Sequence, residues 1–419
     1  MPVELPVVDL DELDPSPPRS LTWCALFVLV VIVGCAVSIF EWPKTEPTGT
    51  AWFWCRSFVL PALFWCALFG LRLHYYNDEC AKIAAELEEK VTRRKTAIEF
   101  ASEPLAVLDF SYVTALGISG LSAKIAEGES ALRAQTTRDG DTGVRHTALA
   151  FDDGTSTLDL HRKCFTALLT QLSGAVGELP RDVPLYAYLD VPVTLLNEGQ
   201  LLATWNACCE MARMRQMKTE LLPAGEGIMA IDKWLDVSGG PRLERVVLFV
   251  SVELHEHTLN DSGEAAVALL LGWAPLVARR RINSVAMLHR PIEADSKALT
   301  ESLSKAMLWG NSKGAEIEDA WTSGLVGEGS ASFFRCSTEL AIEFVNTPEF
   351  SGIHNVENAL GNCRASAEWL NVALASEHAA LTGKPQLTIS SDRALRICVV
   401  RPPLHQGNGP IAGELEQSD

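Results

Sequence analysis

The 419-residue sequence is poor in basic charge. Lysine and arginine number 35 against 53 aspartate and glutamate residues, which gives a formal net charge of −18 at pH 7. A nucleic-acid-binding protein needs a concentrated basic surface to displace counterions from phosphate, and so does a chain that lies flat on anionic lipid. The charge balance therefore argues against nucleic acid as a partner and against that mode of lipid binding.

Paired cysteine spacing is missing as well. Cys24, Cys35, Cys55 and Cys66 lie within apolar runs, and the other cysteines are scattered. This pattern excludes a disulfide framework and predicts a set of reduced, cytoplasmic thiols.

Motifs that hold phosphate or activate serine are absent too. The glycines around Glu226 are not followed by Gly-Lys-Ser/Thr, and no Gly-x-Ser-x-Gly elbow occurs. We therefore predict no phosphate-binding loop, no serine-hydrolase triad and no cofactor.

Two long apolar runs near the N-terminus indicate where the protein is located. Residues 21–40 carry no charge and, at ~1.5 Å rise per residue, span the ~30 Å hydrocarbon core of a bilayer. Residues 51–71 contain Pro61 and carry Arg56 near their start, where its side chain can reach the interface. The link is short and contains two prolines, so we predict a two-helix transmembrane hairpin over residues 21–71 in the lipid bilayer.

Charges beside the spans predict their orientation. Lys44 is the only basic residue in the link, whereas several lysines and arginines follow the second span between residues 72 and 95. The positive-inside rule then places both termini in the cytoplasm. A cleaved signal peptide is the alternative for the first run, but residues 1–20 are acidic with Arg19 as their only base, the wrong sign for a signal sequence.

The rest of the chain predicts a helix that leaves the membrane, followed by an α/β body. Residues 77–101 contain strong helix formers and no glycine or proline, and beyond them short apolar runs alternate with helical patterns. We predict strands at 105–110, 185–190, 245–252, 265–271, 284–289 and 396–401, and helices at 158–172, 199–215, 228–235, 296–307 and 358–380. The strand runs lack clean alternation, which predicts strands covered on both faces.

A break in the apolar pattern near residues 272–281 divides the body in two. We predict an acidic tail (1–20), the hairpin (21–73), a connecting helix (74–103), two halves (104–275 and 276–401) and a tail (402–419) whose composition predicts disorder.

Three segments resemble β-ketoacyl synthases. Leu-Ala-Val-Leu-Asp-Phe-Ser-Tyr-Val-Thr-Ala-Leu-Gly at 105–117, with residues 125–133, resembles the family's opening strand, Val-Thr-x-Leu-Gly turn, helix and Gly-x-Ser step. Residues 263–271 resemble a strand late in the first half, and residues 355–370 resemble the segment that carries a catalytic lysine and histidine. The resemblance implies an α/β class body with the duplicated, five-layered α/β/α/β/α thiolase-like fold, and it leaves a homodimer open.

The family's catalytic residues are not found at the matching positions. A condensing enzyme needs a thiolate at a helix N-terminus and two histidines, or a histidine and an asparagine. The matching helix opens Ala224-Gly-Glu-Gly-Ile-Met-Ala, without cysteine. Trp321, or the preceding alanine in the neighbouring register, replaces the first histidine; Glu357 replaces the lysine; Asn362 replaces the second histidine and can still donate a hydrogen bond. We therefore predict a degenerate, inactive family member.

Two other groups of residues admit a functional interpretation. Cys208 and Cys209 lie beside Trp205 and are expected to pack as apolar residues rather than act as a nucleophile. Glu253-Leu-His-Glu-His257 can place two histidines on one face, but a zinc site needs a third protein ligand and none is evident, so we favour a solvated loop and no metal.

A third group is the basic triplet Arg279, Arg280 and Arg281. We expect a solvated turn between the two halves, with docking of an acidic partner as the alternative.

Two functions of different class fit these features. The first is a membrane-tethered, inactive ketosynthase-like scaffold or adapter; its layout resembles accessory and lipase-adapter proteins of bacterial type VI secretion, with effector or spike components as partners at the inner membrane. The second is an enzyme or binder of acyl chains or acyl carrier protein in lipid or polyketide metabolism, with a pocket between the halves. A channel is a weaker alternative, because two spans with one arginine make a poor conduction path.

Overall fold

The computed structural model describes Leu5 and residues 17–44, 46–137, 140, 143–151, 156–192, 197–255 and 257–403. The chain forms two compact units, Glu4–Ala97 and Ile98–Asp419, and each is described by itself. The predicted disorder of the C-terminal tail and most of the acidic N-terminal tail lie outside the described residues.

The first unit is a helical hairpin. Its elements are α1 (Ser20–Phe40), α2 (Ala51–Trp54), a π-helical turn η2 (Cys55–Val59) and α3 (Leu60–Ala101). By length and composition the helices Ser20–Phe40 and Ala51–Ala101 are apolar enough to cross a membrane, and only 6% of the apolar window of each is buried. The predicted second span and the connecting helix are thus one continuous helix.

Pro61 is accommodated in the hairpin by contacts with α1. Proline has no backbone N–H, so the carbonyl of Ser57 lacks its usual helical donor. The thiol of Cys35 donates to that carbonyl at 3.3 Å. Gly34 gives the proline ring room, since a Cβ there would lie 2.1 Å from Pro61 Cγ. The two helices therefore pack closely at the point where the second one loses a hydrogen bond.

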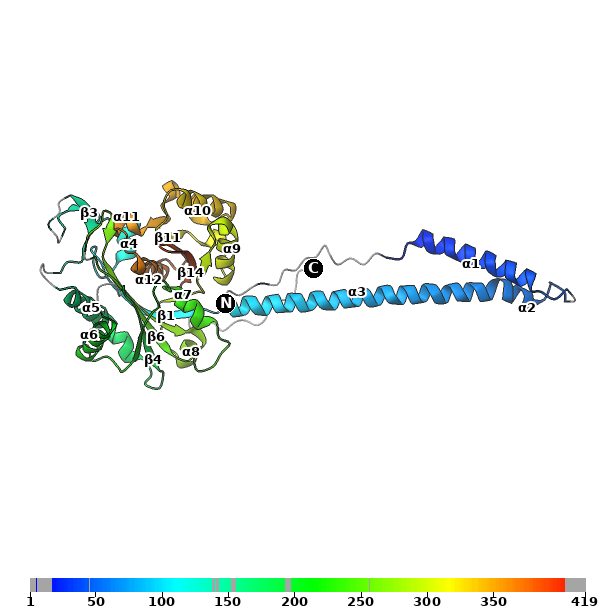
Figure 1. Ribbon diagram of the computed structural model, residues 1–419, viewed down its shortest axis with the longest axis horizontal. Coiled ribbons are helices and arrows are strands. Elements are labelled where there is room, and N and C mark those ends of the chain that lie inside the picture. Colours follow the sequence, from blue (N-terminus) through cyan, green and yellow to red (C-terminus); the bar gives the residue numbers. More distant parts are fainter. Residues whose placement is uncertain are drawn as a thin grey trace. The chain divides into compact units, whose positions relative to one another are not determined.

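The second unit is an α/β body built from two copies of one strand pattern (Figure 1). The first copy contains β1 (Leu105–Val113), α4 (Leu121–Ala126), β2 (Arg133–Gln135), β3 (Val144–Thr147), α5 (Thr157–Glu178), β4 (Leu185–Asp190), α6 (Glu198–Met211), β5 (Lys218–Leu221), α7 (Met229–Leu235), β6 (Val246–Glu253), β7 (Ser262–Gly263), β8 (Ala265–Trp273) and α8 (Ala274–Arg280). The second contains β9 (Ala286–Leu288), β10 (Ile292–Ala294), η3 (Ser296–Ala298), α9 (Leu299–Trp309), η4 (Gly314–Glu316), β11 (Asp319–Ser323), α10 (Glu328–Glu339), η5 (Glu343–Asn346), η6 (Pro348–Phe350), β12 (Ile353–Asn355), α11 (Val356–Leu360), α12 (Ala365–Thr382), β13 (Gln386–Ser391) and β14 (Leu395–Arg401).

Strand order and direction show the duplication. The strands run β5-β4-β6-β8-β1 in the first copy and β12-β11-β13-β14-β9 in the second, and β1 pairs with β9 where the copies join. In each copy the first two pairings are parallel and the next two antiparallel. A small sheet of β2, β3 and β7 lies beside the first copy.

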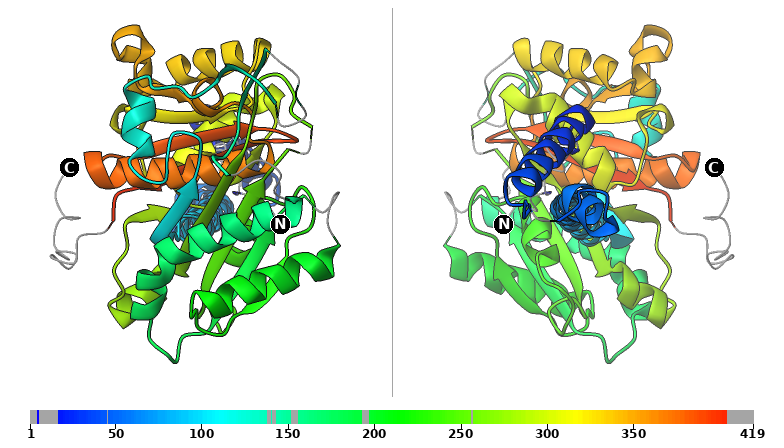
Figure 2. Two further views of the ribbon diagram at one scale, coloured as in Figure 1. Left: turned by 90° about the vertical axis from the view of Figure 1, so that its left-hand side faces the viewer. Right: turned by 90° about the vertical axis from the view of Figure 1, so that its right-hand side faces the viewer.

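Three hydrophobic cores separate five layers (Figure 2). One core lies between α5, α6 and the first set of strands, and another between α9, α10 and the second set. The middle core surrounds α12 and includes side chains of β1, β6, β8 and β11. Every residue of β6 is buried, which confirms the prediction of strands covered on both faces.

Each predicted strand is present, but the prediction over residues 358–380 is wrong. Two helices occur there, α11 and α12, separated by Gly361 (φ 80°) and Arg364 (φ 42°). Asn362 between them donates its N–H to the Asp261 carbonyl and accepts from the Gly263 N–H, so pairing with β7 interrupts the helix. The predicted solvated turn at 279–281 is correct only in part: all three arginines are exposed and Arg281 lies in a turn, but Arg279 and Arg280 form the last turn of α8.

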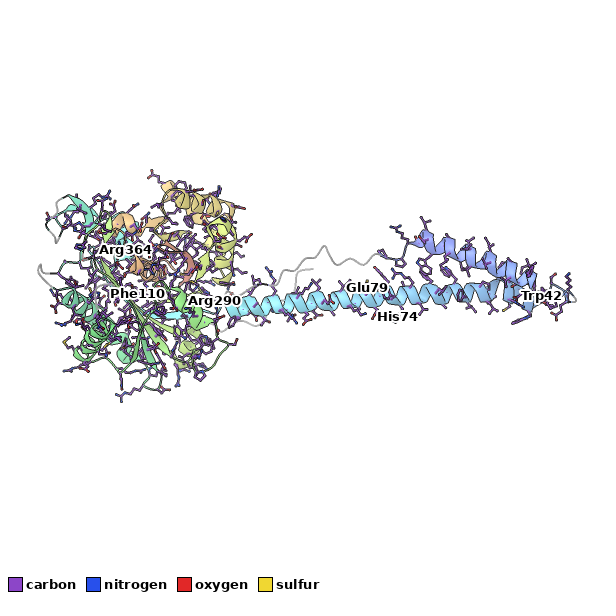
Figure 3. All side chains as sticks on the ribbon, in the orientation of Figure 1. Trp42, His74, Glu79, Phe110, Arg290 and Arg364 are labelled. Atoms are coloured by element: carbon purple, nitrogen blue, oxygen red, sulfur yellow. The ribbon has the colours of Figure 1, made fainter. Side chains whose placement is uncertain are left out.

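Arg290 joins α7 to the end of α3 within the second unit (Figure 3). Its guanidinium is 1% exposed; it donates to Asp232 Oδ1 at 2.8 Å and to the Leu235 carbonyl at 2.7 Å. The same group lies 5.1 Å from the ring centroid of Phe100. A buried charge with these partners fixes α7 in place.

Candidate functional site

The candidate site lies where α7 of the first half begins against α12 of the second. The segment before α7 turns at Gly225 (φ 84°) and Gly227 (φ 47°), a conformation that favours glycine. A Cβ at Gly227 would lie 2.5 Å from both Glu368 Oε2 and Arg396 Nη1. The space that a side chain at this position would need is therefore already filled.

An ion pair of the second half fills that space. Arg396 Nη1 donates to Glu368 at 2.8 and 2.7 Å, and the side chains are 7% and 5% exposed. The backbone N–H of Ile228 donates to Glu368 Oε2 at 3.1 Å, and Arg396 Nη2 donates to the Gly225 carbonyl at 2.6 Å. Burial raises the pKa of Glu368, and Arg396 opposes that rise.

Two further buried carboxylates lie at strand ends of the first half, and the charges of the ion pair act on one of them, Asp190. Asp190, at the end of β4, accepts a hydrogen bond from Trp369 Nε1 at 2.8 Å, and burial raises its pKa to about 6. Burial likewise raises the pKa of Glu253, at the end of β6, to about 7. The Oε2 atom of Glu253 is buried without a hydrogen-bond partner, which favours the protonated form.

Two cavities adjoin these groups. The larger, about 750 Å³, lies between α6, β5 and the start of α7 on one side and α12 and the β13–β14 turn on the other. Its wall includes Glu198, Glu220, Asp392 and Arg393 as well as leucines and prolines, so charged groups interrupt a largely apolar lining. The smaller, about 10 Å³, is lined by Ser323, Gly324, Glu357, Asn362 and Arg364, among others.

Known proteins are similar to the body in structure. No family model and no curated protein matches the sequence. The ketosynthase from module 1 of the bacillaene synthase from Bacillus amyloliquefaciens FZB42 aligns with a TM-score of 0.53 at 12% identity, covering 75% of this chain and 75% of that chain. The ketosynthase from module 6 of the bacillaene synthase from Bacillus subtilis 168 gives 0.51 at 12%, covering 73% and 71%. The body has the ketosynthase fold.

This ketosynthase-like body confirms the predicted thiolase-like architecture and brings two of the three predicted site residues together. Glu357 and Asn362 line the smaller cavity, where burial raises the pKa of Glu357 and Asn362 Oδ1 accepts from the Arg364 N–H at 2.8 Å. Trp321 does not line it. Its side chain is fully buried in the middle core, and Nε1 donates to Gln386 Oε1 at 3.1 Å.

No cysteine of the described ranges joins two histidines in a cluster. Cys363, next to Asn362, is buried, and burial raises the pKa of its thiol. Cys208 is buried between α5 and α6, and burial raises the pKa of Cys209 to about 12. Neither environment produces the thiolate that a condensing enzyme uses as its nucleophile.

The other predicted groups lie apart from the site. Arg279 pairs with Glu244 at 3.0 Å, and Arg280 pairs with Asp182 at 2.5 Å, all with half-exposed side chains. The predicted solvated loop at 253–257 is wrong for its first residues: Glu253 is the last residue of β6 and is buried, and the His255 side chain is 6% exposed, with Nε2 3.1 Å from the Gly263 carbonyl.

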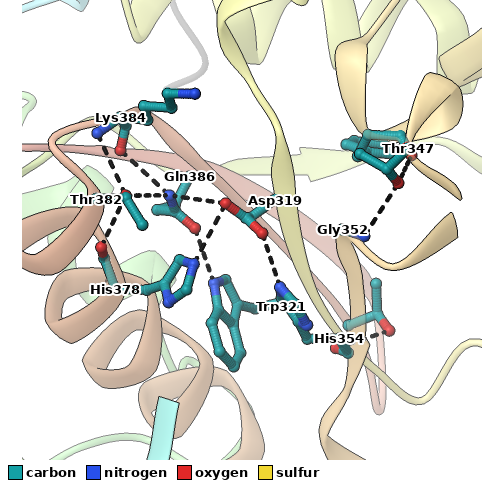
Figure 4. Close-up of polar contacts among 11 residues, drawn as sticks. Asp319, Trp321, Thr347, Gly352, His354, His378, Thr382, Lys384 and Gln386 are labelled. Carbon is teal, nitrogen blue, oxygen red and sulfur yellow. Dashed lines mark hydrogen bonds and ion pairs between the residues drawn. The ribbon is translucent and has the colours of Figure 1, made fainter. Parts of the chain in front are cut away.

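Sequence reasoning missed one cluster. Asp319, His354 and His378 come from β11, β12 and α12, and their potential ligand atoms lie within 4.8 Å of one another (Figure 4). It is the one such group of three His, Cys, Asp or Glu side chains in the part of the chain that the structure describes. Spacings of tens of residues form no recognisable metal motif, so no local signal marked it.

Proposed function

We propose that the protein is a membrane-tethered, catalytically inactive ketosynthase-like scaffold or adapter that binds protein partners at the cytoplasmic face of a bacterial inner membrane. The Glu368–Arg396 ion pair beside Gly227 carries the inactive part of this proposal. A nucleophile needs both a side chain and access to a substrate at that position. Residues 224–230, which open the helix that the resemblance matches to the nucleophile-bearing helix, include no cysteine, and two buried charged groups occupy the volume beside Gly227.

The aromatic residues of the hairpin support the membrane part. Trp23 contacts Trp65 and Phe69, while beyond the other end of α1 Trp42 contacts Phe53. The two tryptophans of α1 and its end are separated by about 28 Å at ~1.5 Å per residue, close to the ~30 Å hydrocarbon thickness. Aromatic side chains at both interfaces are typical of membrane spans.

Arg56 fits the same arrangement. It pairs with Glu41, which follows α1 at the link, so the one charge of the second apolar run lies at the end of the hairpin and not at its middle. An interfacial position lets the ion pair remain hydrated.

Adapter function in type VI secretion is the finer form of the proposal, with an effector or spike component as partner. It rests on the combination of an anchor, a ketosynthase-like body and a filled catalytic position. Arg279 and Arg280 are candidates for docking an acidic partner. Their ion pairs within the chain are exposed, so replacing Glu244 and Asp182 with acidic groups of another protein loses little free energy. A homodimer stays a prediction.

An acyl-chain or acyl-carrier-protein binder is the alternative, and the 750 Å³ cavity favours it. Cavities of this size accommodate small ligands. The Glu368–Arg396 ion pair and other charged residues share this wall with the apolar groups, so an acyl chain would have to avoid them, and we place this function second.

Affinity capture from native membranes tests the proposal. The full chain is compared with a variant whose residues 21–71 are replaced by an unrelated two-span hairpin, and with one lacking those residues. We expect secretion-machine or effector proteins with the first two and weaker recovery without any anchor. Recovery of acyl carrier protein in their place would overturn the adapter proposal in favour of the alternative.

A further inference from the structure

The buried cluster of Asp319, His354 and His378 has the donor set of a metal site. His354 Nε2 lies 2.9 Å from Asp319 Oδ1, and His378 Nε2 lies 3.3 Å from Asp319 Oδ2 (Figure 4). The two imidazoles thus approach the two oxygens of one carboxylate. We propose that these three residues bind a divalent transition-metal ion, with zinc as the preferred ion.

The distances are close to those that zinc requires. Bonds of ~2.0–2.2 Å in tetrahedral geometry keep donor atoms ~3.3–3.5 Å apart. The His378–Asp319 distance of 3.3 Å already has that value, whereas the His354–Asp319 distance of 2.9 Å must lengthen by about half an ångström. No pair of ligand atoms exceeds 4.8 Å. His378 Nδ1 is buried without a hydrogen-bond partner, so a small rotation of this ring breaks no bond at that atom.

The chemistry of the donors favours the same class of ion. Two imidazole nitrogens and one carboxylate oxygen suit zinc and its neighbours, whereas magnesium and calcium prefer oxygen ligands alone. Three protein ligands with a water in the fourth position are a common zinc arrangement. The side chains of Asp319 and His378 are 15% and 14% exposed, which leaves a route for the ion and that water, while His354 is 5% exposed.

Neighbouring groups hold the ligands in position. The ring of Trp321 lies 4.5 Å from that of His354 and 5.4 Å from that of His378, and it closes the buried side of the cluster. Gln386 Oε1 accepts from Trp321 Nε1, and Gln386 Nε2 lies 3.5 Å from Asp319 Oδ2. Such outer contacts orient ligands and raise metal affinity. The buried Trp321 ring therefore supports the two histidines of the cluster.

The competing arrangement is a carboxylate that accepts hydrogen bonds from both imidazoles and binds no ion. For each Nε2 to bind the ion, its proton must leave that nitrogen: it moves to Nδ1 of the same ring if the imidazole is neutral, or to solvent if the imidazole is charged. Bound metal would also join β11, β12 and α12, so it is expected to raise the melting temperature of the body.

The test uses the full chain in detergent, without a histidine tag, stripped with a chelator and then given Zn²⁺ or Co²⁺. We expect about one Zn²⁺ per chain by mass spectrometry after gel filtration, a rise in melting temperature, and a low-coordination cobalt absorption spectrum. Asp319→Asn and His354→Gln should weaken binding by at least about tenfold. His161→Gln is the matched control, since His161 is also buried but lies outside the cluster on α5, and it should bind like the wild type.

Two results would overturn the proposal. One is a wild-type chain that retains no zinc and gives cobalt the spectrum of the hydrated ion; this measurement does not depend on any variant folding. The other is equal binding by the wild type and folded cluster variants, which would place the ion elsewhere.

Discussion

The two halves of the body share one strand pattern but differ in the helix that precedes the central strand, β6 in the first half and β13 in the second. In the first half this helix, α7, has 7 residues, whereas its counterpart α12 has 18 and forms the centre of the molecule. The first half contributes Gly225, Gly227 and backbone groups to the junction; the second contributes Glu368 and Arg396. The shared strand pattern therefore brings α7 and α12 together, and the buried charged side chains between them come from the second half alone.

The largest expected effect comes from removing one member of the ion pair. Arg396→Met should lower the free energy of unfolding by about 3–5 kcal/mol, because Glu368 would stay buried without a counter-charge. The Glu368→Met/Arg396→Met double variant should recover much of that loss. Chemical unfolding of the full chain in detergent measures both.

Arg279→Met is the matched control for that experiment. Its ion pair with Glu244 is exposed, so the expected loss is under about 1 kcal/mol. If Arg396→Met and the Glu368→Met/Arg396→Met double variant lose the same free energy of unfolding, the two charges do not act as a pair.

Substitution of Trp321 in the second half is expected to have the next largest effect. Trp321→His should cost about 2–4 kcal/mol, since a smaller polar ring leaves a void in the middle core. Trp321→Phe keeps the ring contacts and loses only the donor to Gln386, so about 1–2 kcal/mol is expected. A stable Trp321→His variant with decarboxylase or condensing activity would contradict the inactive assignment.

A titratable residue ends the central strand of the first half but not that of the second, so the first half should make the stability of the body depend on pH. Glu253 ends β6 with a pKa raised to about 7, whereas the corresponding strand β13 ends in serine. The folded state holds the Glu253 proton more tightly than the unfolded state. The associated stability is complete below about pH 4.5 and is lost as the pH rises through about 7.

The free energy of unfolding of the wild type should fall between pH 5 and pH 8. In Glu253→Gln this fall should be smaller by up to about 2–3 kcal/mol. Asp190 adds to this loss in the same direction and stays in the variant. Melting temperatures across this pH range give the comparison, with exposed Glu244→Gln as control. Parallel profiles for wild type and Glu253→Gln would show that Glu253 is charged throughout.

The smallest effect is expected from the cysteines of the first half. Cys208→Ala and Cys209→Ala should each cost about 1 kcal/mol or less and leave partner recovery unchanged, because both thiols pack as apolar groups. Alkylation of the folded protein at neutral pH should be slow, as burial raises the pKa of both. Loss of partner recovery in a variant that still folds would assign a function to one of these thiols.

Much of the fold was predictable because its strands are apolar throughout. Val246–Glu253 and Ala265–Trp273 are runs that pack on both faces, and such runs stand out in a sequence. The strand Asp319–Ser323 was missed, because its sequence Asp-Ala-Trp-Thr-Ser is mostly polar and its pairing with β12 and β13 is determined by distant segments.

For the candidate site, the sequence predicted which residue type is absent but not which side chains are present. The missing cysteine could be read from residues 224–230, but Glu368 and Arg396 lie 28 residues apart and more than a hundred from Gly227. No local pattern links a helix residue, a strand residue and a glycine turn. The Asp319, His354 and His378 cluster escaped for the same reason, since only the sheet order brings β11 and β12 together.

The glycine turn before α7 also constrains how this protein can change. A mutation that supplies a thiol at residue 227 alone meets two charged groups at 2.5 Å, and a mutation that removes only one of those groups strands the other. Each single change at these three positions is therefore expected to give a less stable chain. The glycine at residue 227 is thus fixed by its neighbours, and this position should tolerate fewer substitutions than the exposed surface of the body.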